Sequence, residues 1–128
     1  MCSQNLTVLY VDDDQNCLDV MRTILESEGH AMLEARTAEQ GLEILESQRP
    51  DAVIVDLMME ELDSGVMLIK NLRAKGDQLP VYMLSSVGDR LVQYVDAEAL
   101  NITGIMQKPI RGDQILGVLR AMPREARG

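Results

Sequence analysis

Asp51-Ala52-Val53-Ile54-Val55-Asp56 is the stretch that decides the fold. Four consecutive apolar residues, three of them β-branched, predict a strand that is buried on both of its faces. Strands of this kind belong to parallel sheets that helices cover on both sides. This strand ends in the carboxylate of Asp56. A lone aspartate at such a place often only begins a turn, so its meaning depends on what ends the other strands.

Three further apolar segments are also followed by polar side chains: Asp12 and Asp13 after residues 6–11, Ser85 after residues 81–84, and Lys108 after residues 104–107. In a parallel α/β sheet the carboxyl ends of all strands lie at one edge, where ligands bind. We therefore expect two kinds of group to meet there, the carboxylates of the three aspartates and the hydroxyl and amine of Ser85 and Lys108.

The length and composition favour one globular α/β domain over the whole chain, 1–128, with a core at about 6–121 and a loose tail at 123–128. A net charge of -9 argues against direct contact with nucleic acid or an anionic membrane, because phosphate contacts need lysine and arginine. The two cysteines have no metal-ligand spacing, and no apolar run is long enough for a membrane span. We therefore expect a cytoplasmic protein with reduced thiols.

Strands are predicted at 6–11, 31–35, 51–56, 81–85 and 104–107, with a helix after each. The first helix is capped by Asp14 and ended by Gly29, the capping box Thr37–Gln40 opens the second, and the fourth spans about 89–100. The alternation predicts a parallel sheet with helices on both faces. The helical residues expected to face inward are Cys17, Leu18, Met21, Ile24, Leu25, Ala38, Leu42, Leu45, Leu68, Ile69, Leu72, Leu91, Val92, Val95, Ala99, Ile115, Leu116, Leu119 and Met122.

Three carboxylates in one small site repel one another, by about 4 kcal/mol for each pair at ~4 Å and an effective dielectric constant near 20. One of them must stay protonated, or a cation must neutralise them. Mg²⁺ suits such a set of oxygen ligands and leaves room for a phosphoryl oxygen. One carboxylate can then attack phosphorus and form an aspartyl phosphate. The ammonium of Lys108 and the hydroxyl of Ser85 would neutralise the other phosphoryl oxygens.

The combination of Val11-Asp12-Asp13, Asp56, Ser85 and Lys108-Pro109 resembles the receiver domain of two-component response regulators. The resemblance implies a flavodoxin-like five-stranded sheet of order 2-1-3-4-5 with five helices. It implies a signalling domain that accepts a phosphoryl group on Asp56 from a histidine kinase or a histidine phosphotransfer protein. Ser85 and Lys108 would contact this group, and output would pass through the face formed by the fourth helix, fifth strand and fifth helix. The ligands it implies for Mg²⁺ are Asp13, Asp56 and the backbone carbonyl of Met58, with Asp12 acting largely through water.

The sequence departs from this family in three places. The loop after Asp56 lacks the usual proline, so it is less preset. Ile105 stands where the family commonly has an aromatic residue that moves on phosphorylation, so a switch must use Ser85 and the fourth helix. Met58 and Val87, which flank the phosphoryl group in receivers, are apolar and offer nothing to orient water. We therefore expect slow autodephosphorylation.

Other readings remain open. Asp12 to Asp14 are also compatible with a solvated capping cluster, Ser85 with a local hydrogen bond, and Lys108 with an exposed strand end. A second class of function is an interaction module on the same fold that is never phosphorylated. A Mg²⁺-dependent phosphohydrolase is less well supported because Met58 replaces its acid, and a nucleotide binder lacks its phosphate loop. The downstream partner, homodimer formation and the presence of an output domain stay open.

Overall fold

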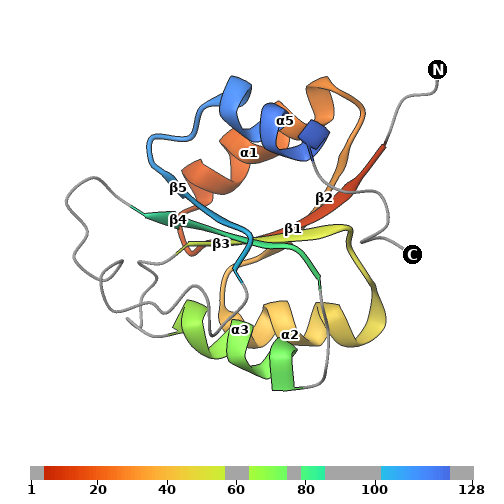
Figure 1. Ribbon diagram of the computed structural model, residues 1–128, viewed down its shortest axis with the longest axis vertical. Coiled ribbons are helices and arrows are strands. Elements are labelled where there is room, and N and C mark those ends of the chain that lie inside the picture. The colour runs from red at the N-terminus through yellow and green to blue at the C-terminus, as the bar shows by residue number, and fades with distance from the viewer. Residues whose placement is uncertain (1–4, 57–63, 75–78, 86–101, 122–128) are drawn as a thin grey trace.

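A single sheet of five parallel strands forms the centre of the molecule, with the order β2-β1-β3-β4-β5 (Figure 1). The computed structural model describes residues 5–56, 64–74, 79–85 and 102–121. Its strands are β1 (Thr7–Val11), β2 (Ala31–Ala35), β3 (Ala52–Asp56), β4 (Val81–Ser85) and β5 (Gly104–Gln107). The predicted flavodoxin-like order is confirmed. The helix expected at 89–100 lies outside the described residues.

Helices cover both faces of the sheet. They are α1 (Gln15–Ser27), α2 (Ala38–Ser47), α3 (Ser64–Ala74) and α5 (Gly112–Ala121). In Figure 1, α1 and α5 lie together on one side, and α2 and α3 lie together on the other. This arrangement is the doubly wound one that alternating strands and helices predict.

Side chains alternate between the two faces along each strand, so each face has its own core. Even-numbered residues of β1, β3 and β4 join the core under α1 and α5, which includes Tyr10, Ile54 and Tyr82. Odd-numbered residues join the core under α2 and α3, which includes Val11 and Val55. Neighbouring strands are in register for this division, because Tyr10 pairs with Ile54 and Ile54 with Tyr82.

Helix α1 begins and ends at the predicted residues. The side chain of Asp14 accepts a hydrogen bond from the backbone N–H of Asn16 at 2.9 Å, which caps the first turn. Gly29 follows the helix with a φ of 82°, a conformation that glycine adopts without strain. Of the five residues expected to face inward, Leu18, Met21 and Leu25 are fully buried, whereas Cys17 and Ile24 are half-buried at its margin.

The start of α2 differs in one bond from the predicted capping box. The hydroxyl of Thr37 accepts from the N–H of Gln40 at 3.0 Å, as expected. The side-chain oxygen of Gln40, however, accepts from the N–H of Arg36 at 2.7 Å instead of from Thr37. The reciprocal bond has moved one residue upstream and still satisfies a backbone donor in front of the helix.

The inward faces of the remaining helices agree with the prediction where they are described. Leu68, Ile69 and Leu72 of α3 and Ile115 and Leu119 of α5 are buried. Ala38, Leu42 and Leu45 of α2 are partly buried against the α2–α3 core, and Leu116 is also half-buried. Met122 and residues 91–99 lie outside the described part. Among the described helices, none combines the length and hydropathy needed to cross a membrane.

Candidate functional site

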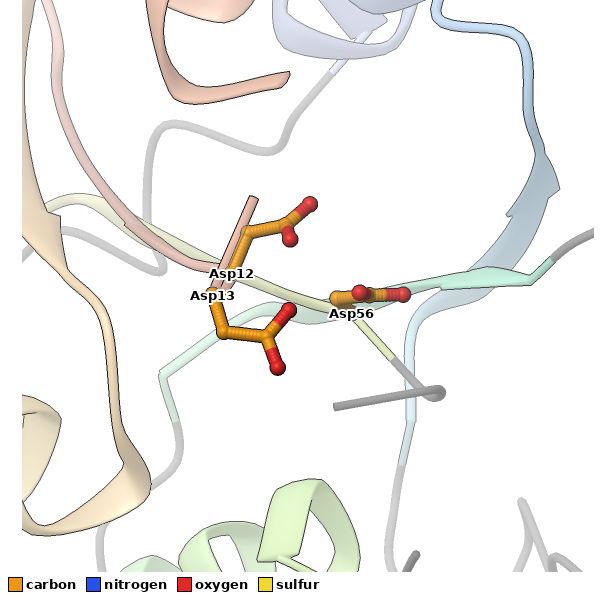
Figure 2. A group of neighbouring side chains, drawn as sticks. All are labelled: Asp12, Asp13 and Asp56. Atoms are coloured by element: carbon orange, nitrogen blue, oxygen red, sulfur yellow. The ribbon is translucent and has the colours of Figure 1, made fainter. Parts of the chain in front are cut away.

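Three carboxylates meet at the carboxyl edge of the neighbouring strands β1 and β3 (Figure 2). Asp12 and Asp13 follow β1, and Asp56 is the last residue of β3. The pairing of Val11 with Val55 brings Asp12 beside Asp56. One carboxylate oxygen from each aspartate lies within 4.8 Å of the others. Asp12 and Asp56 are buried and Asp13 is half-buried, so the cluster opens toward solvent on the Asp13 side.

Lys108 supplies a positive charge to this cluster from the end of β5. Its Nζ lies 3.2 Å from Oδ2 of Asp12 and 3.3 Å from Oδ2 of Asp56. Burial by itself would lower the pKa of Lys108, but the negative charges of Asp56 and Asp12 outweigh burial and raise it. Lys108 therefore stays an ammonium group. One ammonium against three carboxylates leaves the site with an excess of negative charge.

That excess, on hard oxygen donors at one edge, fits a divalent cation such as Mg²⁺. Asp13, Asp56 and Asp12 are the described residues whose carboxylates are close enough to share one ion. The backbone carbonyl of Met58 was also predicted as a ligand, but Met58 lies outside the described residues. Val87, the second residue named in the prediction about autodephosphorylation, lies outside them as well.

Asp12 is fixed by hydrogen bonds on both of its oxygens. Oδ1 accepts from the backbone N–H of Asp14 at 2.9 Å. Oδ2, which also contacts Lys108, accepts a hydrogen bond from the hydroxyl of Tyr10. Tyr10 is fully buried, and burial, together with this bond to Asp12, raises the pKa of its hydroxyl, so it stays a donor. Sequence reasoning missed Tyr10, although residues two apart in a strand share a face.

Ser85 is buried at the end of β4, and its backbone contacts Lys108. Its carbonyl oxygen accepts from the N–H of Lys108 at 2.7 Å. Ser85 also pairs with Gln107 in the parallel ladder of β4 and β5. The backbone of Ser85 therefore fixes where the Lys108 side chain begins. The Lys108–Pro109 peptide bond that follows is cis.

Arg36 is a second residue near the site that the sequence did not suggest. It follows β2, and its Nη2 donates to the backbone carbonyl of Asp13 at 3.3 Å. The backbone N–H of Asp12 donates to the carbonyl of Ala35 at 3.0 Å. These two bonds tie the segment that carries Asp12 and Asp13 to the end of β2.

A family model described as the response regulator receiver domain matches residues 8–120. The chain belongs to the response regulator receiver family. Response regulator MprA of Mycolicibacterium vanbaalenii is 35% identical over 120 residues, which make up 91% of this chain and 50% of that protein. Its counterpart in Mycobacterium ulcerans is 33% identical over 126 residues, or 96% of this chain and 52% of that protein. The receiver thus spans about half the length of these relatives.

Solved structures agree with the fold. NtrX from Brucella abortus has a TM-score of 0.80 and 26% identity, covering 97% of this receiver and 26% of that chain. The chemotaxis response regulator CheY4 of Vibrio cholerae has a TM-score of 0.78 and 23% identity, covering 91% of this receiver and 98% of that chain. At that identity the second likeness speaks for the fold alone.

Proposed function

We propose that this receiver accepts a phosphoryl group on Asp56 from the phosphohistidine of a histidine kinase or histidine phosphotransfer protein, in a Mg²⁺-dependent reaction. The observation that carries the proposal is the position of Lys108, whose Nζ lies 3.3 Å from Asp56 and 3.2 Å from Asp12. An ammonium group beside the carboxylate that ends a buried strand is placed to neutralise a phosphoryl group transferred to that carboxylate.

In the proposed step, one oxygen of Asp56 attacks phosphorus. A P–O bond to Asp56 forms while the P–N bond to the donor imidazole breaks, and the imidazole nitrogen keeps the electron pair and takes up a proton. The ammonium of Lys108 and the hydroxyl of Ser85 would face the phosphoryl oxygens, which carry the charge that develops. The burial of Asp56, 2% exposed, keeps bulk water away and strengthens these electrostatic contacts.

Mg²⁺ would supply the positive charge that lets three carboxylates and a phosphoryl group share one site. Asp13, Asp56 and the backbone carbonyl of Met58 are the proposed ligands, and Asp12 would act largely through water. Lys108 contacts the carboxylates of Asp12 and Asp56, and Arg36 donates to the backbone carbonyl of Asp13. The chain thus holds the carboxylates of Asp12 and Asp56 and the backbone of Asp13 in place before any cation is bound.

Output is proposed to pass through β5, α5 and the segment that precedes them. Ile105 lies on β5 and is 39% exposed, so this face presents an apolar side chain that a partner can cover. Because Ile105 is not aromatic, the switch would depend on the Ser85 end of β4. The downstream partner is an output domain or a separate protein. This assignment also implies a cytoplasmic location.

The test is direct phosphorylation. Purified receiver is incubated with Mg²⁺ and acetyl phosphate, or with a phosphorylated histidine kinase, and intact mass reports the gain of one phosphoryl group. We expect the wild type to be labelled, and Asp56→Asn and samples in EDTA to stay unlabelled. Beryllofluoride with Mg²⁺ should also raise the melting temperature of the wild type but not that of Asp56→Asn. No labelling and no beryllofluoride effect would favour a phosphorylation-independent interaction module on the same fold.

A further inference from the structure

Tyr10 links the core under α1 and α5 to the acidic site. Its side chain is fully buried, and it belongs to the same core cluster as Leu18, Met21 and Ile115. At its far end the hydroxyl donates to Oδ2 of Asp12. Tyr10 precedes Asp12 by two residues along the same chain, so both side chains project from one face of the sheet.

The oxygen that Tyr10 binds is the same oxygen that Lys108 contacts. Oδ2 of Asp12 receives the Tyr10 hydroxyl and, at 3.2 Å, the ammonium of Lys108, while Oδ1 receives the N–H of Asp14 at 2.9 Å. Three donors, two from the segment around Asp12 and one from the residue that follows β5, therefore fix the orientation of this carboxylate. In Figure 2 the Asp12 carboxylate points away from that of Asp13, which agrees with this fixation.

We infer that Tyr10 is a positioning residue of the site: its hydroxyl holds the Asp12 carboxylate as the anchor of Lys108 and makes Asp12 a weaker ligand for the cation. This inference rests on the proposed function. It adds a residue and a role to that function, because it explains what would keep Asp12 out of direct contact with the cation while Asp13 and Asp56 would ligate it.

The physical argument concerns charge and lone pairs. A neutral hydroxyl leaves the negative charge of Asp12 in place but occupies a lone pair and withdraws electron density from Oδ2. Lys108 then finds a fixed, ionised partner beside Asp56. Without the hydroxyl, Oδ2 can turn toward the cation, and the ammonium of Lys108 loses the anchor that holds it over Asp56. Cation binding and phosphoryl transfer should therefore respond in opposite directions.

Tyr10→Phe removes the hydroxyl and keeps the buried ring. For this variant we expect Mg²⁺ to bind about 3- to 10-fold more tightly than to the wild type, as measured by calorimetry. At saturating Mg²⁺, labelling of Asp56 by acetyl phosphate should be about 3- to 10-fold slower. A purely structural role would weaken both properties together, so opposite changes identify positioning.

Tyr82→Phe is the matched control. Tyr82 is also a buried tyrosine of the same core, two strands away in the same register, but among the described residues no carboxylate is bonded to its hydroxyl, and burial is the cause that raises its pKa. We expect its Mg²⁺ affinity and labelling rate to equal those of the wild type. In an Asp12→Ala background, Tyr10→Phe should change neither property, because Tyr10 acts through Asp12.

A measurement on the wild type does not depend on whether a variant folds. The ring carbon that bears the Tyr10 hydroxyl should shift in NMR spectra when Mg²⁺ is added, and that of Tyr82 should not. Unchanged Mg²⁺ affinity and labelling rate in Tyr10→Phe, a parallel loss of both, or an unshifted Tyr10 signal would each overturn the inference. If the wild type is not labelled at all, the proposed function fails instead, and the Mg²⁺ affinities and the NMR shift still decide the role of Tyr10.

Discussion

The core under α1 and α5 differs from the core under α2 and α3 in what lies at its carboxyl edge. Along the first side, Val8, Tyr10 and Asp12 follow one another on the same face of the sheet. Tyr10 packs in the apolar core and also bonds to Asp12 through its hydroxyl. On the second side, Leu9 and Val11 belong to a cluster of aliphatic side chains, and the half-buried Asp13 follows them. The sheet is shared, so the difference comes from which residues alternate onto each face.

This contrast separates two tasks. The α2–α3 side contributes close packing, because a Cβ added at Gly41 of α2 would collide with Leu68 of α3 and crowd Val11 of β1. The α1–α5 side holds buried carboxylates that repel one another and need Lys108 to remain there. Substitutions in the core under α2 and α3 should change stability through packing. Substitutions at the polar edge of the core under α1 and α5 should change stability through charge. The following four predictions test this separation.

Lys108→Met should have the largest effect. It leaves buried Asp12 and Asp56 without their ammonium, and we expect the free energy of unfolding to fall by roughly 3 kcal/mol in urea denaturation without metal. Adding Mg²⁺ should restore part of this loss. Arg111→Met is the control, because Arg111 pairs with Asp113 at an exposed position and should change stability by less than about 0.5 kcal/mol. Equal effects from both substitutions would contradict the charge argument.

Gly41→Ala should destabilise the protein, although alanine favours helices over glycine. Its Cβ would lie 2.7 Å from Cδ1 of Leu68 and 3.3 Å from Cγ2 of Val11, and we expect a loss of about 1–2 kcal/mol from overpacking. Gly117→Ala in α5 meets no atom within 4 Å and should stabilise by about 0.5–1 kcal/mol. Thermal and urea unfolding measure both. Stabilisation by both substitutions would show that the α2–α3 side is not closely packed.

Asp13→Asn should make the metal-free protein more stable. Neutralising one of three neighbouring carboxylates relieves repulsion, which we expect to raise the free energy of unfolding by about 1 kcal/mol. The same change should abolish most of the stabilisation that Mg²⁺ gives to the wild type. Glu46→Gln on the exposed side of α2 makes the same change in net charge. It should change neither the stability of the metal-free protein nor the stabilisation by Mg²⁺. A destabilised Asp13→Asn protein would mean that Asp13 is held by contacts stronger than the repulsion.

The smallest effect should come from pH at the amino end of β1. Nδ1 of His30, the single histidine of the chain, accepts from the N–H of Leu6 at 3.0 Å, and burial lowers the pKa of His30 below that of the unfolded chain. Its contribution to stability is therefore present above about pH 6.5 and is lost as the pH falls through the folded-state pKa.

His30→Asn keeps an acceptor that does not titrate. The wild type should lose about 0.5 kcal/mol relative to this variant between about pH 7 and pH 5 in urea denaturation, since one neutral hydrogen bond is at stake. The acidic groups titrate in both proteins and cancel in the comparison. A difference that stays constant with pH would show that His30 does not lose this bond when protonated.

Most of the architecture could be predicted because apolar runs and turn residues mark it locally. The bounds of β2, β4 and β5 agree with the prediction. β1 and β3 each begin one residue late, at Thr7 and Ala52, because Asp51 binds Thr7 through both its side chain and its backbone. Side-chain bonds of this kind depend on the tertiary structure, so the pattern of apolar residues along the chain does not predict them.

The site was predicted less completely than the fold. Strand ends named Asp12, Asp13, Asp56 and Lys108, and the structure brings these four together. The hydroxyl of Tyr10 and the guanidinium of Arg36 were missed. A tyrosine inside an apolar run is read as a core residue, and an exposed arginine can bond to many different partners. The ligand or phosphoryl contact of each residue stays a prediction until it is measured.

Tyr10, at the junction of the core under α1 and α5 with the acidic site, gives the molecule a spectroscopic reporter. The chain has no tryptophan and three tyrosines, so its near-ultraviolet absorption and emission come from phenol rings. The hydroxyl of one of those rings donates a hydrogen bond to the buried carboxylate beside the lysine, and such a bond changes both absorption and emission. Titrations with metal or with beryllofluoride should therefore be readable on the unlabelled protein, and Tyr10→Phe would silence that signal.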